Sequence, residues 1–368
     1  MDHVLVAGAS GLVGYAACRN FSSLGWRVTG LSRRQPAGLP GVKLLSLDLT
    51  DAAACRQAAA AFRDVTHVVY AAVKEQPGLF GGWLEQQNIE QNAAMCRNLF
   101  EALLPVAGGL QHVSLLHGTK AYGIHHPRIG PAGVKNPLRE REPRAEHPNF
   151  YFLQEDYLRE RQRGASWGLT VFRPTVIYGD AWGNNMNPIP PLAAYAALLR
   201  AAGEPLHFPG RAGAPVLREA VDVDLVAEAL AWAATSGPAR DGTFNLTNGD
   251  VFLWENTWPA LAQEFGMEVG DHRPLRLAEW LPSRQEAWAD LVGRHGLAAP
   301  ADVVEFAGAN SIVYLDMLLA GAPSPATPIL NSTIAVRQAG FHACMDSEDM
   351  FRKWARRMHE LRLVPPRP

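Results

Sequence analysis

A glycine-rich turn near the N-terminus is the first segment whose residue types could do chemistry. The apolar run at 4–7 predicts a buried strand, and Gly8, Gly11 and Gly14 follow it, leading into a helical stretch at 12–24. Such glycines let the backbone approach a pyrophosphate, and the helix N-terminus adds N–H groups and partial positive charge. The turn therefore predicts a dinucleotide site. Contacts are expected at Gly8, Ser10, Gly11, Leu12 and Val13.

The end of the second predicted strand, 27–31, indicates which dinucleotide is bound. Enzymes that use NAD place an acidic residue there, whereas this chain has Ser32, Arg33 and Arg34. Two guanidinium groups suit the 2′-phosphate of NADPH, which a carboxylate would repel. The alternative is a solvated basic pair in a loop. NADPH is therefore the expected cofactor.

Further cofactor contacts are expected where later strands end. They are Asp48 and Leu49 after the third strand, Ala71 and Ala72 after the fourth, and Ile177; Tyr151 is expected to contact the cofactor as well. Asp48 is explained equally well as a turn or helix-cap residue.

The candidate catalytic pair is Tyr151 with Lys120. The one Tyr-x-x-x-Lys motif, Tyr70 to Lys74, follows the fourth strand on the adenine side, far from the hydride, so we reject it as catalytic. Tyr151 stands at the start of a predicted helix, where Glu155 occupies the position usually held by lysine. Lys120 follows the fifth strand, and if it lies close it favours a more acidic tyrosine. Taken singly, each residue is equally explained by packing or by solvation.

Several further motifs carry a resemblance that covers residues 4 to about 356. The chain resembles the progesterone 5β-reductase / iridoid synthase family, atypical short-chain dehydrogenases/reductases of plants, and is identified as a bacterial-type member. The motifs lie at 118–120, 149–156, 173–179, 185–187, 205–210 and 244–254.

The resemblance implies an NADPH-dependent reductase of the C=C bond of enones. Hydride goes to the β-carbon, and the enolate oxygen is stabilised by Tyr151 and Lys120. Neither a metal nor a covalent nucleophile is required. Substrate contacts are expected at Tyr122, Trp182, Met186 and Asn187.

Two departures from the family pattern concern the substrate. Ala121 stands where the family usually has histidine, and Phe152 replaces a second tyrosine. The loop at 123–148 contains five prolines. The stretch at 121–128 also differs from the plant enzymes, which carry aromatic residues there that help line the substrate pocket. A smaller or more polar enone is therefore an alternative to a steroid.

Three rival functions differ in what they require of the sequence. A sugar-nucleotide epimerase or dehydratase requires NAD, an acidic residue after the second strand and a well-placed Tyr-x-x-x-Lys pair. The sequence gives no sign of any of the three. A carbonyl reductase needs the same oxygen-directed donor and stays open. A non-catalytic NADP sensor stays open too, although the retained tyrosine and lysine argue against it.

The arrangement of predicted elements indicates an α/β fold. Strands and helices alternate to about residue 179, which predicts a doubly wound parallel sheet, a Rossmann fold, with a smaller and mainly helical substrate cap. The expected division gives residues 1–180 and 215–249 to the NADP-binding domain, and 181–214 and 250–368 to the cap.

Composition sets the broad limits on partners and location. The net charge is −2, which gives no sign of a nucleic-acid or membrane partner. The four cysteines have no metal-ligand spacing, and His125 with His126 is better explained as a solvated pair. We expect a cytoplasmic protein that acts on a small molecule, with a homodimer left open by analogy to the fold.

Overall fold

The computed structural model describes residues 2–76, 78–79, 81–210, 216–320 and 328–367. The chain forms two compact units, each built from three segments. Unit 1 comprises Met1–Thr175, Val223–Thr247 and Asn331–Ala343. Unit 2 comprises Val176–Asp222, Asn248–Leu330 and Cys344–Pro368. Each unit is described by itself.

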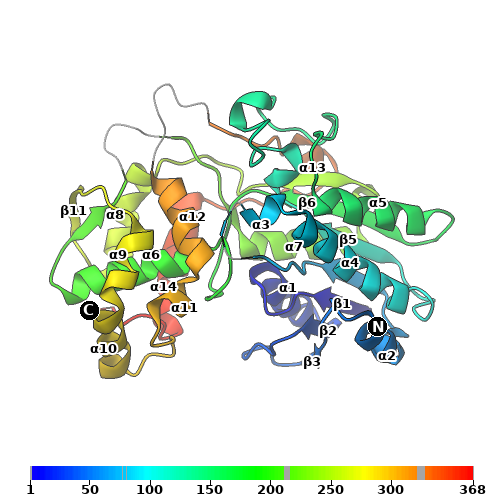
Figure 1. Cartoon of the computed structure of the whole chain (residues 1–368), viewed down its shortest axis with the longest axis horizontal. Coiled ribbons are helices and arrows are strands. Elements are labelled where there is room, and N and C mark those ends of the chain that lie inside the picture. The colour runs from blue at the N-terminus through cyan, green and yellow to red at the C-terminus, as the bar shows by residue number, and fades with distance from the viewer. Residues whose placement is uncertain (1, 77, 80, 211–215, 321–327, 368) are drawn as a thin grey trace. The chain divides into compact units, whose positions relative to one another are not determined.

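Unit 1 is built on a seven-stranded sheet in the order β10-β6-β5-β4-β1-β2-β3, with every pairing parallel (Figure 1). The strands are β1 (His3–Ala7), β2 (Arg27–Ser32), β3 (Val42–Ser46), β4 (His67–Tyr70), β5 (His112–Leu116), β6 (Gly168–Pro174) and β10 (Thr243–Leu246). The order runs outward from β1 in both directions, which confirms the predicted doubly wound sheet. The central strands are apolar runs because both faces of such a sheet are covered.

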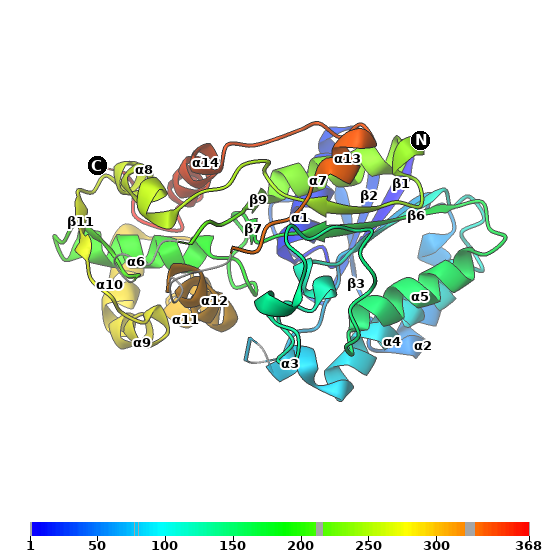
Figure 2. The same cartoon turned by 90° about the horizontal axis from the view of Figure 1, so that it is seen from above.

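Helices cover both faces of this sheet (Figure 2). On one side α1 (Leu12–Ser23) packs against α7 (Val223–Thr235). On the other side α4 (Gln86–Leu103) packs between α2 (Ala52–Gln57) and α5 (Phe150–Gln162). The core on this side is formed by buried side chains of β1, β4 and β5 with Leu99, Phe100 and Leu103 of α4.

One predicted helix is divided in two. The sequence predicts a single helix from Trp83, whereas the structure has α3 (Gly81–Leu84) and then α4. Glu85 between them has extended backbone angles, φ −74° and ψ 123°. The predicted loop at 123–148 is confirmed, since its one regular element is a short 3-10 turn, Pro131–Gly133, among the described residues.

Unit 2 is mainly helical, as the sequence predicts. Its central helix is α6 (Ile189–Ala201), whose residues are buried from Ile189 through Leu199. A helix that is apolar on every side needs partners all round. They are α8 (Trp254–Phe265), α10 (Gln285–His295), α11 (Val303–Ala307), α12 (Ala309–Leu319) and α14 (Ser347–Glu360).

Two pairs of short strands, and a late segment of the chain that returns to unit 1, complete the fold. In unit 2, β8 (Leu206–Phe208) pairs with β11 (Val269–His272), and β7 (Ile177–Tyr178) pairs with β9 (Val221–Asp222). Residues 331–343, which the sequence analysis expects in the cap, pack in unit 1, where α13 (Ile334–Gln338) lies against β10. Among the described residues, no helix combines the length and apolarity needed to cross a membrane.

Candidate active site

The glycine turn between β1 and α1 is packed so tightly against neighbouring backbone that side chains would not fit at Gly8 and Gly14. Gly8 has φ +94°, and a Cβ on it would lie 2.8 Å from the carbonyl oxygen of Ala71. A Cβ on Gly14 would lie 2.1 Å from the carbonyl oxygen of Gly8. The predicted contacts Ala71 and Ala72 thus adjoin the turn. Gly11 precedes α1 without a side-chain cap. These features suit a turn that presents backbone N–H groups to a pyrophosphate.

The basic pair after β2 is exposed. Among the described residues, neither Arg33 nor Arg34 forms an ion pair with an acidic side chain. Both guanidinium groups are therefore accessible to an anionic ligand. Ser32 is the last residue of β2, so the three predicted contacts follow one another at the strand's carboxyl end.

Asp48 is held as a turn residue. Its carboxylate accepts hydrogen bonds from the backbone N–H and the hydroxyl of Thr50, at 2.9 and 2.8 Å. The bond from the Thr50 backbone is the main cause that lowers the pKa of Asp48. The adjacent Leu49 is buried. Contact of either residue with the adenine stays a prediction.

One asparagine joins the two candidate catalytic residues. Asn149 is the N-cap of α5, and its Oδ1 accepts a hydrogen bond from the backbone N–H of Tyr151 at 3.0 Å. Its Nδ2 donates to the carbonyl oxygen of Lys120 at 3.2 Å. Lys120 lies in a 3-10 turn, Thr119–Tyr122, shortly after β5. The start of α5 and the turn after β5 therefore meet at Asn149.

Aromatic rings surround the phenol of Tyr151, which is 8% exposed. The imidazole of His117 stacks on it, with ring centroids 4.4 Å apart and planes at 18°. Trp83 and Phe150 approach with centroids at 5.4 and 4.8 Å. A Cβ on Gly118 would lie 3.3 Å from the Tyr151 hydroxyl, so glycine leaves room beside that oxygen.

His117 contributes a neutral ring to this site. It is buried, and neither ring nitrogen has a hydrogen-bond partner of ordinary geometry among the described residues. Burial, and then the positive charge of Arg173, hold the pKa of His117 well below its usual range, against the opposing effect of the Tyr151 backbone. His117 therefore contacts Tyr151 as an uncharged ring.

Lys120 supplies positive charge. Its Nζ lies 4.0 Å from the centroid of a Trp83 ring. Burial lowers the pKa of Lys120 to about 8, while the carboxylate of Glu75 acts in the opposite direction. At neutral pH the ammonium is thus still mostly protonated. Burial, and then Lys120 itself, lower the pKa of the nearby His125 to about 3, so His125 is uncharged.

The rejected Tyr-x-x-x-Lys motif lies in the core. Tyr70 is 1% exposed and packs against Phe100, with ring centroids 6.3 Å apart. Burial raises the pKa of Tyr70 well above its usual value. This hydroxyl cannot act as a readily ionised donor.

Tyr122 is occupied in a buried network. Its hydroxyl donates to Oδ1 of Asn245 on β10 at 2.6 Å, and the guanidinium carbon of Arg173 lies 5.0 Å from its ring centroid. A contact between Tyr122 and substrate stays a prediction.

The other predicted substrate contacts, and the predicted cofactor contact Ile177, belong to unit 2. Trp182 is 40% exposed. Asn187 is fully buried, and its Nδ2 donates to the carbonyl oxygens of Gly179 and Ala181 at 2.9 and 2.7 Å, which braces the segment before α6. Met186 has a positive φ of 56°. The ligand roles of Ile177, Trp182, Met186 and Asn187 stay predictions.

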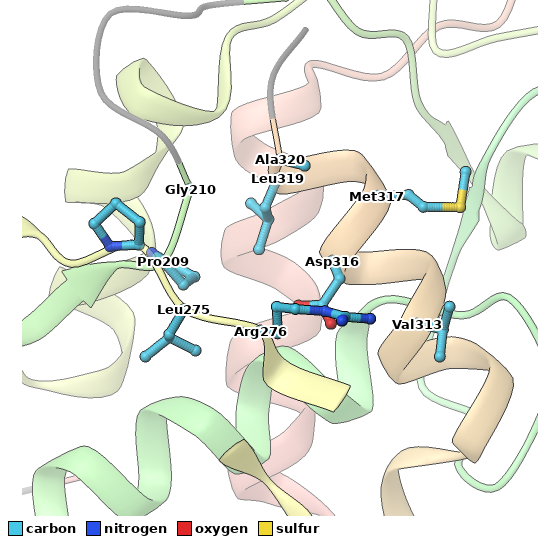
Figure 3. A pocket seen from close by; sticks show the side chains of 10 residues that line it. Pro209, Gly210, Leu275, Arg276, Val313, Asp316, Met317, Leu319 and Ala320 are labelled. Carbon is cyan, nitrogen blue, oxygen red and sulfur yellow. The ribbon is translucent and has the colours of Figure 1, made fainter. Parts of the chain in front are cut away.

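Unit 2 also contains a cavity of about 490 Å³ (Figure 3). It is lined by Pro209, Gly210, Pro274, Leu275, Arg276, Val313, Asp316, Met317, Leu319 and Ala320. None of the predicted site residues lines it. Its acidic group, Asp316, accepts hydrogen bonds from the backbone N–H groups of Leu277 and Ala278, so it caps α9 (Leu277–Trp280).

Three residues near the candidate catalytic pair were missed by the sequence analysis: Trp83, His117 and Asn149. An asparagine before a helix is a known N-cap signal, so Asn149 could have been found. No pattern points to Trp83, because its contacts lie far away in the sequence. Among the described residues, no group of three or more His, Cys, Asp or Glu side chains could hold a metal ion.

Comparison with known proteins adds to this geometry. Residues 4–246 match the model of the NAD dependent epimerase/dehydratase family. The chain belongs to this family. Solved structures of similar fold include the UDP-glucose 4-epimerases of Thermotoga maritima, at 14% identity and TM-score 0.67, and Thermus thermophilus, at 18% and 0.63. They cover 97% and 96% of this chain, and it covers 99% and 98% of theirs.

Two plant enzymes are more similar to this chain in sequence. The (S)-8-oxocitronellyl enol synthase CYC2 of Camptotheca acuminata is 32% identical over 86% of this chain and 83% of the relative. The 3-oxo-Delta(4,5)-steroid 5-beta-reductase of Arabidopsis thaliana is 30% identical over 98% and 92%. The predicted resemblance is confirmed, although these plant relatives do not support a bacterial affiliation.

Proposed function

We propose that this protein reduces the C=C bond of an α,β-unsaturated carbonyl compound with NADPH. The observation that carries the proposal is the pair of buried Tyr151 and half-buried Lys120, joined by Asn149, in a chain about 30% identical to an enol synthase and a steroid 5-beta-reductase. The glycine turn and the exposed pair Arg33 and Arg34 suit NADPH.

The residues divide the chemistry between them. NADPH, when bound, supplies hydride to the β-carbon of the enone. The electron pair of the C=C bond then shifts toward the carbonyl oxygen, where negative charge develops. The hydroxyl of Tyr151 donates a hydrogen bond to that oxygen, and the Lys120 ammonium adds positive potential. A proton from water or from Tyr151 completes the saturated ketone at the α-carbon.

The direct test is NADPH oxidation with 2-cyclohexen-1-one, with the products identified by mass spectrometry. Formation of cyclohexanone supports C=C reduction. Formation of cyclohexenol would instead indicate a carbonyl reductase. Tight NADPH binding without turnover of this or larger enones would favour a sensor.

The first variant to test is Tyr151→Phe, which removes the proposed donor and keeps the ring. We expect kcat to fall about 100-fold or more while the Kd for NADPH changes little, because loss of one oxyanion donor typically has this cost. The matched control is Tyr157→Phe on the same helix, whose hydroxyl donates to Glu101. Unchanged kcat in Tyr151→Phe would remove this hydroxyl from the mechanism.

A further inference from the structure

Trp83 touches both candidate catalytic side chains. The residue is 5% exposed in the short helix α3. One of its rings has the Lys120 ammonium 4.0 Å from its centroid. It also meets the phenol of Tyr151 edge-on, at 5.4 Å between centroids and 69° between planes. Phe150 packs beside it at 4.8 Å.

The face of an indole ring can stabilise an ammonium that has lost part of its hydration. Burial removes water from the ammonium and so favours its neutral form. The negative face of the ring replaces part of the lost solvation, most strongly for tryptophan and at distances below about 6 Å. The ring also restricts a lysine stem that otherwise samples many rotamers.

We propose that Trp83 is a positioning residue of the reaction centre, whose indole holds the Lys120 ammonium in its charged form next to Tyr151. The catalytic role of Lys120 rests on the proposed function, whereas the stabilisation of its ammonium by the Trp83 ring does not.

Three titratable groups act on Lys120 or contact the same indole. Glu75, from the segment after β4, favours the ammonium. His125, from the loop after the 3-10 turn, is uncharged near neutral pH. Tyr151, on α5, contacts Trp83 edge-on. A change of Trp83 to another apolar residue leaves all three in place, so it isolates the contribution of the ring.

The chain offers a direct readout because it contains only five lysines, at 43, 74, 120, 135 and 353. The chain labelled with ¹³C-lysine gives five resolvable side-chain titrations by NMR, and Lys120→Arg assigns the signal. In Trp83→Leu, which keeps apolar bulk, we expect the proton affinity of Lys120 to fall roughly two- to thirtyfold. Trp83→Phe keeps an aromatic face and should restore most of it.

Trp26→Leu is the matched control, because Trp26 packs on Phe21 and His67 elsewhere in unit 1. It should leave the Lys120 titration unchanged. A Lys120 titration equal to wild type in Trp83→Leu overturns the proposal, even if the variant is less stable. If Trp83→Leu does not fold, the smaller downward shift expected in Trp83→Phe relative to wild type serves as the test, and its absence overturns the proposal.

Activity separates this proposal from the proposed function. A lowered Lys120 titration with a matching shift of the alkaline limb of the kcat profile for enone reduction supports both. If Trp83→Leu lowers the pKa of Lys120 but the protein reduces no enone, the role of Trp83 is supported and the proposed function is contradicted.

Discussion

At the scale of single residues, aromatic rings pack on both Lys120 and Tyr151. Trp83, Phe150 and His117 are all uncharged near neutral pH. Burial lowers the pKa of the Lys120 ammonium to about 8, so its protonation changes just above neutral pH. Such a centre responds strongly to small changes around the lysine.

The basic pair after β2 carries the prediction on cofactor choice. Arg33→Ala should weaken NADPH binding about ten- to hundredfold, because it removes a charged hydrogen-bond donor to the 2′-phosphate. NADH binding should change less than about twofold, since NADH lacks that phosphate. Fluorescence titration with each nucleotide measures both constants.

Arg63→Ala is the control for loss of one exposed charge in the same unit. It should affect neither nucleotide. Equal weakening of NADPH and NADH in Arg33→Ala would contradict the assignment to the 2′-phosphate.

At the scale of elements, the start of α5 is coupled to the end of β5 through Asn149. Asn149→Ala removes the cap of α5 and the bond to the Lys120 carbonyl together. We expect about 1 kcal/mol lower stability, the usual cost of a lost cap, and a fall in kcat of about tenfold or more, because both catalytic backbones lose their common partner. Urea unfolding and enone turnover measure the two effects.

Asp346→Ala is matched to this variant. Asp346 caps α14 in unit 2 by accepting hydrogen bonds from the backbone N–H groups of Glu348 and Asp349. Its loss should cost similar stability and leave kcat unchanged. If the two variants lose kcat equally, Asn149 acts only through stability.

The elements themselves follow closely from local sequence, whereas parts of the site do not. The strands of the sheet and α1, α5 and α7 were predictable because apolar period and caps are local signals. The break at Glu85 is not visible in a helical pattern. Trp83 and Asn245 could not be found, because their partners Lys120 and Tyr122 are brought to them only by the tertiary fold.

At the scale of the whole molecule, three buried histidines share the amino edge of the sheet. Val4, next to His3 on β1, pairs with His67 on β4, which pairs with His112 on β5. Burial lowers the pKa of each, and that of His112 to about 4. Below about pH 6.5 these histidines bind protons in the unfolded chain but stay neutral in the folded chain. The free energy of unfolding therefore falls as the pH drops toward 4.

His112→Gln should reduce this acid sensitivity. Between about pH 7.5 and about pH 5, the wild type should lose roughly 2 kcal/mol more stability than the variant, which is the share of one histidine. Urea midpoints at the two pH values give the difference. An identical loss in both proteins would show that the pKa of His112 is the same in the folded and the unfolded chain.

The hydrogen bonds of Asn245 have a consequence for how the protein is made. Its side chain accepts from Tyr122 and donates to the carbonyl oxygen of Ser332, so residues from three distant segments meet at one amide. On the ribosome, the glycine turn, lysine and tyrosine emerge long before β10 and Ser332 do. Until then β6 is an unpaired edge, which invites wrong pairing. The Tyr122 hydroxyl thus gains its amide acceptor only after β10 has been made, and the amide gains the Ser332 carbonyl later still.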